Sequence, residues 1–591
     1  MPHKTRTVRA RSAQASLFDE SPGRPSAKRS SGGSGSSRGK AERKPAPGKK
    51  SSKKAKKKTE APRAEAPPRR RAKARPREDA ASMAARQREI SISEFFTKNR
   101  HLLGFDNPQK ALLTAVKEAV DNSLDACEEA GILPDLVVEI TEVGESRFRI
   151  AVEDNGPGIV KQQIPRIFGK LLYGSKFHRL KQQRGQQGIG ISAAGMYGQL
   201  TTGRPVSIIS RTGKRSPAHQ FQLVIDTKKN APVIQKDTTI EWERAHGTRV
   251  EIELEAVYKK GRRSVDDYIE QTALANPHAE IRFVTPKDQP RIYERVTREL
   301  PKESVEIKPH PYGVELGILA RMLKESKARN LRGALTGDFS RVSAAVADRI
   351  CETAGVSAGT RASRLTAAQV EMLFQAIPKV KIMAPPTAIL SPIGEELLQT
   401  GLEERIEAEF STAVTRPPAV YRGNPFQIEA GLAYGGNLPG DDLAQLYRFA
   451  NRVPLQYQQS GCAIFKSALS VDWRKYGLQQ SRGTLPTAPM VVSVHMVSVW
   501  VPFTSESKEA VASYPEIVKE IRLALMEAGR RLGIFVRRRR RVADEAKKRA
   551  HIEKYIPAIG KALQEILDLS DSHRDRTVAN LKDILERSRK L

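Results

Sequence analysis

Cysteine is scarce in this sequence, with three cysteines among 591 residues. They lie far apart, at Cys127, Cys351 and Cys462, and their number is odd, so the sequence predicts neither a disulfide framework nor a zinc site and favours a reducing, intracellular environment. A secretory signal and long hydrophobic runs are also missing. The longest nearly apolar run, residues 490–503, is interrupted by two serines and a histidine. It therefore favours a buried strand over a membrane span.

Acidic residues are too few to balance the basic ones, and the formal net charge is +34. Residues 1–80 hold 25 Lys or Arg and 7 Asp or Glu, a net charge of +18. This segment is rich in Ser, Gly, Pro, Ala and Lys and cannot bury much apolar area, so we expect a disordered basic tail over residues 1–88. The tail is expected to bind DNA phosphates without sequence preference; a solubilising or targeting tail is the alternative.

One short stretch of the tail, Gln14-Ala-Ser-Leu-Phe18, carries two large apolar residues in hydrophilic surroundings. It resembles the peptide by which partners dock on bacterial sliding clamps. A five-residue pattern also arises by chance, so an incidental cluster is the alternative.

A polar stripe marks the first motif, because Glu118, Asn122 and Asp125 recur at helical spacing. Asp106 and Asn107 supply cap oxygens, and Pro108 suits the first helical position. Apolar residues face the other way, at Leu112, Val116, Val120 and Leu124. The sequence therefore predicts a rigid helix with one chemical face.

That face suits phosphoryl transfer. The neutral amide oxygen of Asn122 fits Mg²⁺, whose other ligands are waters and substrate phosphates. Glu118, one turn earlier, is placed to orient and deprotonate an attacking water. Taken alone, the run would instead indicate surface polar residues on an amphipathic helix.

A second motif, Asp154-Asn-Gly156-Pro-Gly158, follows two β-rich segments at residues 136–140 and 148–152. Asp154 therefore falls at a strand end that enters a glycine loop. Its carboxylate can accept a hydrogen bond from an adenine amino group, while the two glycines let the backbone approach the base.

A third motif, Gly185-Gln-Gln-Gly188-Ile-Gly190, leads into a predicted helix, and free N–H groups at such a terminus hold phosphate oxygens. Its order and spacing do not fit the Rossmann fingerprint, and a plain turn is the alternative. A fourth piece, Gly247-Thr248, lies between β-like runs at 239–242 and 250–254.

This ordered set resembles the GHKL ATPase superfamily, which includes gyrase B, heat-shock chaperones, sensor histidine kinases and MutL. Over about residues 90–540, the sequence more closely resembles the B subunits of type IIB topoisomerases (topoisomerase VI). The runs that carry the likeness are residues 168–177, 184–199, 450–455 and 472–478.

The resemblance implies an ATP and Mg²⁺ site, with Glu118 as general base and Asn122 as the magnesium ligand. Asp154 and Thr248 would contact adenine. The other implied ATP-binding residues belong to the glycine loops and the lid: Gly156, Gly158, Tyr173, Gly174, Ser175, Lys176, Gly185, Gln186, Gln187, Gly188, Ile189 and Gly190.

The resemblance also implies a cation that reaches the γ-phosphate from a Trp-Lys-x-Tyr run of a second domain. Here that run is Trp473-Arg474-Lys475-Tyr476. Arg474 holds the matching position, although its forked head is not equivalent to an ammonium group. Lys475 is the second candidate, and the alternative is that both side chains face solvent.

By length and resemblance we expect a multidomain α/β protein. The expected parts are the tail at 1–88, a GHKL (Bergerat) ATPase α/β sandwich at 89–306, a helix-two-turn-helix insert at 307–386, an α/β transducer with a left-handed βαβ crossover at 387–541 and a helical extension at 542–591. Expected helices lie at 314–323, 342–354, 367–377, 442–449 and 516–532, and expected strands at 426–430 and 491–499.

The expected function is that of the B subunit of a type II DNA topoisomerase. By resemblance, ATP dimerises two copies across double-stranded DNA, and a separate A subunit cuts both strands in a heterotetramer of two A and two B chains. Such a protein would be cytoplasmic and nucleoid-associated in a prokaryote, without a membrane segment. The alternatives are a MutL-type GHKL ATPase, a sensor kinase, or a DNA-binding scaffold without turnover.

Overall fold

The computed structural model describes residues 80–85, 90–174, 180–185, 188–505 and 507–587. The chain divides into two compact units, residues 1–86 and 87–591. The described part of the first unit is a short helix, α1 (Ala80–Ala85). The tail up to residue 79, with the Gln14–Phe18 stretch, lies outside the described residues. All other elements belong to the second unit.

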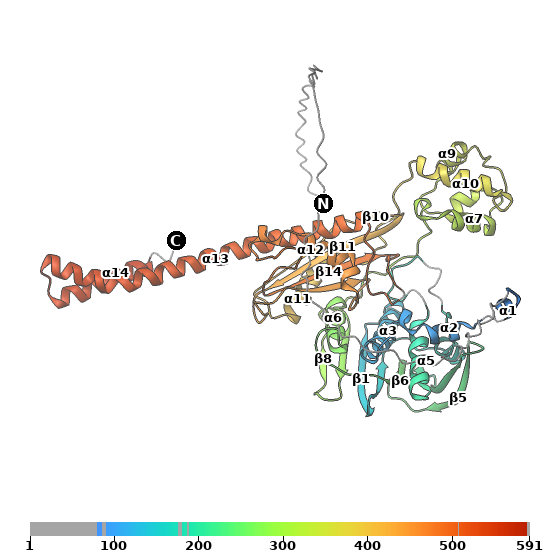
Figure 1. Ribbon diagram of the computed structural model, residues 1–591, viewed down its shortest axis with the longest axis horizontal. Helices are drawn as coiled ribbons and strands as arrows, with labels where there is room; N and C mark the ends of the chain where they lie inside the picture. Colours follow the sequence, from blue (N-terminus) through green and yellow to red (C-terminus); the bar gives the residue numbers. More distant parts are fainter. Residues whose placement is uncertain (1–79, 86–89, 175–179, 186–187, 506, 588–591) are drawn as a thin grey trace, which may run out of the picture. The chain divides into compact units, whose positions relative to one another are not determined.

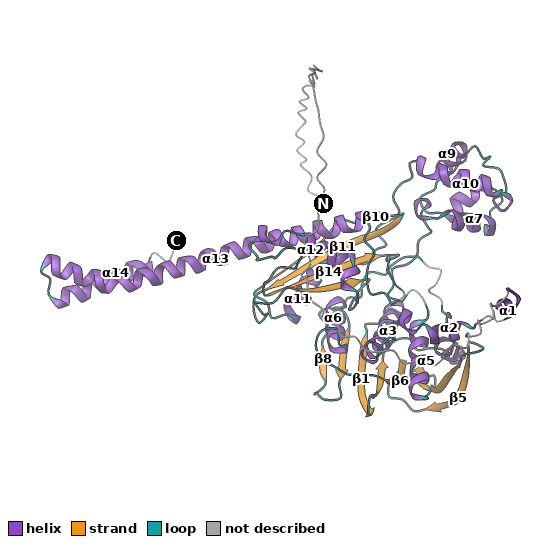
Figure 2. Ribbon diagram, viewed as in Figure 1, coloured by secondary structure: helices purple, strands orange, loops and turns teal. Residues whose placement is uncertain are grey.

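An eight-stranded sheet forms the first α/β layer (Figures 1 and 2). Its order is β5-β4-β3-β6-β2-β1-β7-β8, and β1 and β7 are its one parallel pair among the described strands. The strands are β1 (Asp135–Gly144), β2 (Arg147–Glu153), β3 (Val206–Arg211), β4 (Ala218–Asp226), β5 (Ala231–Ile240), β6 (Gly247–Glu255), β7 (Glu280–Val284) and β8 (Arg291–Tyr293). The helices are α2 (Ile92–Lys98), α3 (Pro108–Glu129), α4 (Ile164–Gly169), α5 (Gly190–Thr202) and α6 (Val265–Ala275).

Helix α3 begins where its sequence signals place it. The Asn107 side chain accepts a hydrogen bond of 2.9 Å from the Lys110 backbone N–H, and Pro108 is the first helical residue. The predicted apolar face is buried, with at most 1% exposure at Leu112, Val116, Val120 and Leu124. The prediction from capping and periodicity is confirmed for this helix.

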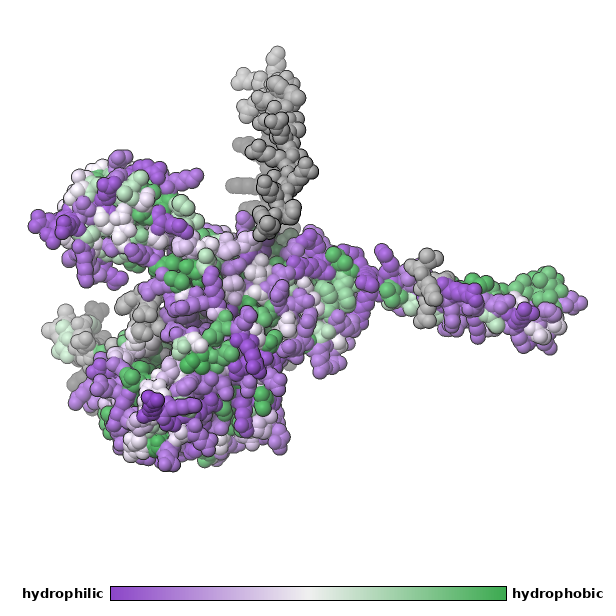
Figure 3. Space-filling model, turned by 180° about the vertical axis from the view of Figure 1, so that it is seen from behind, coloured by the Kyte–Doolittle hydropathy of each residue, from purple (hydrophilic) through white to green (hydrophobic). Residues whose placement is uncertain are grey.

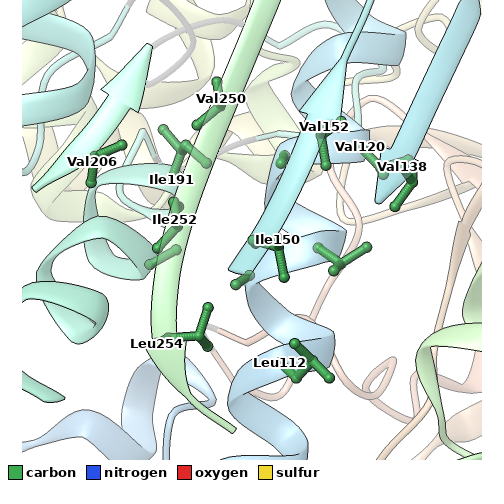
Figure 4. Close-up of a cluster of buried hydrophobic side chains, with 14 of the residues drawn as sticks. Leu112, Val120, Val138, Ile150, Val152, Ile191, Val206, Val250, Ile252 and Leu254 are labelled. Carbon is green, nitrogen blue, oxygen red and sulfur yellow. The ribbon is translucent and has the colours of Figure 1, made fainter. Parts of the chain in front are cut away.

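Helices α3 and α5 pack on the sheet, where α3 contacts β2 and α5 contacts β6. Figure 4 shows the resulting core, in which Leu112 and Val120 of α3 lie with strand residues such as Val138 and Ile150. Ile191 of α5 belongs to the same cluster. One face of the sheet is thereby joined to the two helices that carry the first and third motifs, as the predicted sandwich requires.

A small helical region follows, with its own apolar core. It contains α7 (Leu316–Glu325), α8 (Leu331–Asp338), α9 (Ala344–Ala354) and α10 (Ala367–Ala376). The three helices expected here are present within two residues of their predicted bounds. Helix α8 was not predicted, because Gly333 and Gly337 lower its helix propensity. Its burial of Leu331 and Leu335 explains why it forms nevertheless.

The second sheet has six strands, in the order β10-β11-β14-β12-β13, with β9 beside β11. They are β9 (Phe410–Thr415), β10 (Ala419–Tyr421), β11 (Asn424–Tyr434), β12 (Gln445–Ala450), β13 (Val453–Pro454) and β14 (Met490–Ser498). All nine residues of β14 are buried, which explains its unbroken apolar run. Helices α11 (Glu395–Arg405), α12 (Ala463–Ser470) and α13 (Pro515–Leu567) accompany this sheet.

The helix expected at residues 442–449 is wrong, because this segment forms β12. Its residues Gln445–Ala450 pair with β14 in parallel, and Phe449 is fully buried. Cross-strand pairing and burial therefore override the helix propensity of residues 443–446, Leu-Ala-Gln-Leu. The parallel β12 and β14 are joined through α12, as a βαβ unit requires; its left hand stays a prediction.

Helix α13 is 53 residues long and crosses the predicted boundary at residues 541–542 without a break. Helix α14 (Asp571–Arg587) then packs against it. Apolar side chains remain exposed on this extension, and Figure 3 shows hydrophobic surface at its end. They include Ile552, Tyr555, Ile566, Leu567 and Ile584. No described helix has the length and apolar character to cross a membrane.

Replacing Leu112 by alanine should lower the free energy of unfolding by about 2–5 kcal/mol, because it leaves a cavity between α3 and the sheet. Urea unfolding followed by circular dichroism measures this change. The matched control is Leu200→Ala on α5, whose side chain is 39% exposed, and its effect should stay below about 1 kcal/mol. Equal effects of the two substitutions would contradict the assigned core.

Candidate functional site

A cavity of about 570 Å³ opens between α3, the glycine loops and the second sheet. Most of the predicted site residues line it: Glu118, Asn122, Asp154, Gly158, Tyr173, Gly174, Gly185, Gly188, Ile189, Gly190 and Thr248. Ser175, Lys176, Gln186 and Gln187 lie outside the described residues. The four sequence motifs, distant along the chain, thus meet at one cavity.

Glu118 and Asn122 reach the cavity from one face of α3. Glu118 is half-buried and Asn122 is exposed. The Glu118 carboxylate lies directly against Gly190 at the start of α5, and a Cβ at position 190 would overlap it. Glycine is therefore required there by the close approach of a carboxylate.

Burial shifts the pKa values of two charged neighbours of Glu118 on α3, Asp121 and Lys117. It raises the pKa of Asp121 to about 6 and lowers the pKa of Lys117. Asp121 accepts a hydrogen bond of 3.1 Å from the Tyr268 hydroxyl of α6. Asp121 is 3% exposed, so Glu118 is the carboxylate of this helical turn that reaches the cavity.

Asp154 forms the opposite end of the cavity. Its Oδ1 accepts hydrogen bonds from the backbone N–H groups of Gly156 (2.9 Å) and Thr248 (3.1 Å), and its Oδ2 accepts one from the Ser123 hydroxyl (2.8 Å). Burial raises the pKa of this carboxyl, although these hydrogen bonds oppose the shift. Gly156, which is not among the cavity-lining residues, therefore acts on the carboxylate through its backbone N–H.

Two glycines permit close backbone contacts behind this carboxylate. Gly247 has φ +139°, and a Cβ there would collide with the Asp154 carbonyl oxygen. Gly158 has φ +71° and lies against the Arg211 carbonyl. Because glycine has no Cβ, the chain at Gly158 and at Gly247 can pack closely against its neighbours behind the Asp154 carboxylate.

The start of the third motif, at Gly185, is anchored by the preceding residue, Arg184. This buried guanidinium donates to Asp125 at 2.9 Å and to both oxygens of Glu128 at 2.8 and 2.6 Å. The Gly185 N–H also donates to Asp125, at 3.2 Å. Asp125, the third member of the predicted stripe, thus holds the loop and does not line the cavity.

The charges around Arg184 depend on one another. Burial alone would raise the pKa of Glu128, but the Arg184 guanidinium and the His278 hydrogen bond lower it well below its usual range. The Glu128 carboxylate is therefore ionised in the folded chain.

The chain between Phe503 and Val511 brings a lysine that the sequence analysis missed. Lys508 lines the cavity, is 5% exposed and donates from Nζ to the Arg184 carbonyl at 3.0 Å. Its φ of +52° is left-handed, which is unusual for lysine and frequent at functional sites. The available signal was a charged pair, Lys508-Glu509, directly before an apolar segment.

Arg474 and Lys475 are not among the residues that line this cavity. They belong to a short 3₁₀ helix, Trp473–Tyr476, that contacts α13. The Arg474 side chain is 69% exposed and pairs with Asp472 at 2.8 Å. Neither residue is among those that line the cavity, and the alternative that Arg474 faces solvent agrees with its exposure.

Metal ligands of the acidic, His or Cys type do not gather in the described part of the chain, where no group of three or more was found. The Asn122 amide, which lines the cavity, offers a neutral oxygen of the kind that Mg²⁺ binds.

Two family models match the chain. Residues 107–257 match the family described as histidine kinase-, DNA gyrase B-, and HSP90-like ATPase. Residues 385–548 match the family described as topoisomerase VI B subunit, transducer. The two matches fall on the two sheets that enclose the cavity.

Relatives extend this similarity over most of the chain. The B subunit of type 2 DNA topoisomerase 6 from Methanococcoides burtonii is 50% identical, over 83% of this chain and 79% of the relative. The protein of the same name from Archaeoglobus fulgidus is 48% identical over 85% and 83%. Among solved structures, the ATPase region of Saccharomyces cerevisiae topoisomerase II is 11% identical with a TM-score of 0.34, over 76% of this chain and 99% of that one.

Replacing Glu128 by glutamine should lower the free energy of unfolding at pH 7 by about 3 kcal/mol, because the buried Arg184 guanidinium loses an ionised partner. The pKa of Glu128 in the folded chain lies below the unfolded value of about 4.3, so its carboxylate stabilises the fold above that pH. This stabilisation is lost as pH falls through the folded pKa. The difference in unfolding free energy between the parent and the variant, measured by urea unfolding, should therefore become smaller below about pH 4.

The control is Glu142→Gln, at an exposed position of β1, which should leave the unfolding free energy unchanged at both pH values. A difference that is missing at pH 7, or constant down to about pH 3, would contradict the ionised pair.

Proposed function

The chain belongs to the family of type 2 DNA topoisomerase 6 B subunits, and we propose that its cavity binds ATP with Mg²⁺ and that Glu118 activates the water that hydrolyses it. One observation carries this proposal: Glu118, Asp154 and the start of α5 face one cavity that also receives a buried lysine, Lys508, from the chain that follows β14.

The base end of the nucleotide fits Asp154. Its carboxylate is fixed by three donors, so it can accept a further hydrogen bond from an adenine amino group without moving. The Thr248 hydroxyl lies 3.2 Å from that of Ser210, and both are buried beside the carboxylate. A purine would thus meet a preformed polar wall.

The phosphates fit the start of α5. Gly185, Gly188 and Gly190 line the cavity there, and the first N–H groups of a helix favour anions. Tyr173 and Gly174 line the cavity from the segment proposed as the lid. Ser175 and Lys176, which lie outside the described residues, are proposed as further members of that lid. Gln186 and Gln187 complete the proposed phosphate loop.

A magnesium ion fits the oxygen chemistry of the cavity. The Asn122 amide is exposed, lies one turn from Glu118 and lines the same cavity. Bound Mg²⁺ would supply charge neutralisation at the phosphates. Asn122 would hold it, with waters and phosphate oxygens as the other ligands.

The chemical step then rests on two side chains. Glu118 accepts the proton of the attacking water, since its carboxylate lines the cavity and lies against Gly190 at the start of α5. Lys508 binds the γ-phosphate and stabilises the charge that develops on its oxygens. We assign this role to Lys508 in place of Arg474 or Lys475, because Lys508 alone of the three lines the described cavity.

Membership in the family also supports the partners. We propose that the chain acts with the A subunit of topoisomerase VI, in a heterotetramer of two A and two B chains, and that ATP dimerises the B chains on double-stranded DNA. The A subunit would then cleave both strands, so that supercoils are relaxed and linked DNA is separated.

A basic surface on the second sheet's side supports DNA binding. Exposed Arg474 and Lys475 lie on the 3₁₀ helix that contacts α13, where five arginines follow at residues 537–541. Arg540 donates to the Gly477 carbonyl, which joins the two groups. Such a surface fits phosphates and predicts salt-dependent affinity.

The other hypotheses have less support. The matches over residues 385–548 and over most of the chain favour a topoisomerase component over a MutL-type ATPase. The sliding-clamp peptide at Gln14–Phe18 stays a prediction.

Replacing Glu118 by glutamine should slow ATP hydrolysis by about 10²–10⁴-fold, because the water loses its general base. Affinity for a non-hydrolysable ATP analogue should change little, since glutamine keeps the shape beside Gly190. The control Glu145→Gln, in the exposed β1–β2 turn, should leave hydrolysis unchanged. With the A subunit present, ATP-dependent relaxation should fall with hydrolysis; a variant that hydrolyses ATP at nearly the parent rate would refute the role of Glu118.

Replacing Lys508 by methionine should weaken binding of a non-hydrolysable ATP analogue by about 10–100-fold, the loss expected for one hydrogen bond to a charged group. ADP affinity should change little, because ADP has no γ-phosphate. Arg474→Met and Lys475→Met should leave both affinities unchanged. Calorimetric titration measures these affinities. If Lys508→Met left them unchanged while Arg474→Met or Lys475→Met weakened binding of the analogue, the γ-phosphate ligand would instead lie in the Trp-Arg-Lys-Tyr run.

A further inference from the structure

The chain between Phe503 and Val511 is held at its base and carries charges at its tip. Phe503 and Val511 form an antiparallel bridge, and the Thr504 N–H donates to the Ala510 carbonyl at 2.9 Å. The Val511 carbonyl accepts from the Ala463 N–H at 2.8 Å, at the start of α12. The base of this loop is therefore part of the second sheet's packing.

The tip reaches the first α/β layer at two points of opposite charge. Lys508 donates to the Arg184 carbonyl of the glycine loop. Glu509, the next residue, pairs through Oε1 with Lys110 Nζ at 2.7 Å. Lys110 belongs to the first turn of α3, the helix that carries Glu118 and Asn122.

The Lys110–Glu509 pair is not a surface ion pair. The side chains are 11% and 5% exposed, so solvent screens their attraction little. Lys110 also contacts Asp106 at 2.9 Å and lies over the Tyr457 ring, with 5.2 Å to its centroid. The second oxygen of Glu509 is buried without a hydrogen-bond partner among the described residues. Lys110 thus forms an ion pair with the buried Glu509 carboxylate.

Charge and backbone geometry connect this pair to Lys508. Burial alone would lower the pKa of Lys110, but Glu509 and Asp106 raise it, so the ammonium group stays charged. Adjacent Cα atoms lie about 3.8 Å apart, so holding Glu509 in place also limits how far the Lys508 backbone can move. Lys508 has a left-handed φ of +52°, which persists only where its surroundings enforce it.

We propose that the Lys110–Glu509 pair is a latch that holds Lys508 inside the nucleotide cavity, which makes both residues positioning residues for recognition of the γ-phosphate. The inference rests on the proposed function, since it takes Lys508 as the γ-phosphate ligand. It adds that selection of a triphosphate over a diphosphate depends on an ion pair outside the phosphate site. Opening the latch removes the lysine from the cavity without altering the adenine end.

The test measures affinities of the full chain for a non-hydrolysable ATP analogue and for ADP. Lys110→Met and Glu509→Gln should each lower the preference for the analogue over ADP by about tenfold, the order expected when a positioned group is displaced. The double variant should lose no more than either single variant, because the two residues act as one unit. General damage to the cavity would instead weaken both nucleotides and would overturn the latch.

A matched pair controls for the loss of an ion pair as such. Arg416 and Glu520 pair at 3.2 Å on the second sheet's side and do not line the cavity. Arg416→Met and Glu520→Gln should leave the preference unchanged. Circular dichroism confirms that each variant is folded; should Glu509→Gln unfold, Glu509→Asp, which shortens the side chain but keeps its charge, should lower the preference in the same direction.

Lys508→Met distinguishes a failure of the latch from a failure of the proposed function. If it leaves the preference unchanged, the proposed role of Lys508 fails. If it lowers the preference while the Lys110 and Glu509 variants do not, the latch alone is overturned. Additive losses in the double variant would overturn it as well, since they would show two independent contributions.

Discussion

The buried guanidinium of Arg184 is the contact on which the cavity depends. Its side chain ties the glycine loop to α3 through Asp125 and Glu128, and it reaches Asn276 at the end of α6. Its backbone carbonyl accepts a hydrogen bond from the ammonium group of Lys508, which lies in the chain that follows β14 of the second sheet. A buried charge with several partners cannot move without leaving some of them unpaired. The position of the chain at Arg184 and Gly185 is therefore coupled to both α/β layers.

A line of buried polar groups continues from this point into the second sheet. The Asn276 amide donates to the Arg452 carbonyl, and the Arg452 N–H donates to His495 Nε2. His495 Nδ1 then contacts Glu429 at 2.7 Å, and Glu429 accepts the Gly394 N–H at the start of α11. Burial lowers the pKa of His495, although Glu429 opposes the shift. The neutral ring thus donates at one nitrogen and accepts at the other, which makes this a directed chain of hydrogen bonds between the two layers.

Much of the site could be predicted because its residues are set by local signals. The spacing of Glu118 and Asn122 follows helix periodicity, and Asp154 follows a strand into a glycine loop. Lys508 escaped prediction, because its role comes from a loop of another layer and no local pattern marks a buried lysine. The strand at residues 445–450 escaped for a similar reason, since its partner β14 lies far along the chain, beyond α12. Contacts between distant segments, more than local propensity, account for what the sequence did not reveal.

Helix α13 has a mechanical consequence. From Pro515 to the residue before Pro557 it runs unbroken, about 60 Å at 1.5 Å per residue. Its first turns are embedded in the second sheet's core through Ile517, Ile521 and Leu525. A tilt of about 5° at this root would displace the outer end by about 5 Å over that length. The helix can thus act as a lever arm that converts sub-ångström rearrangements near the nucleotide into ångström-scale travel at a distance.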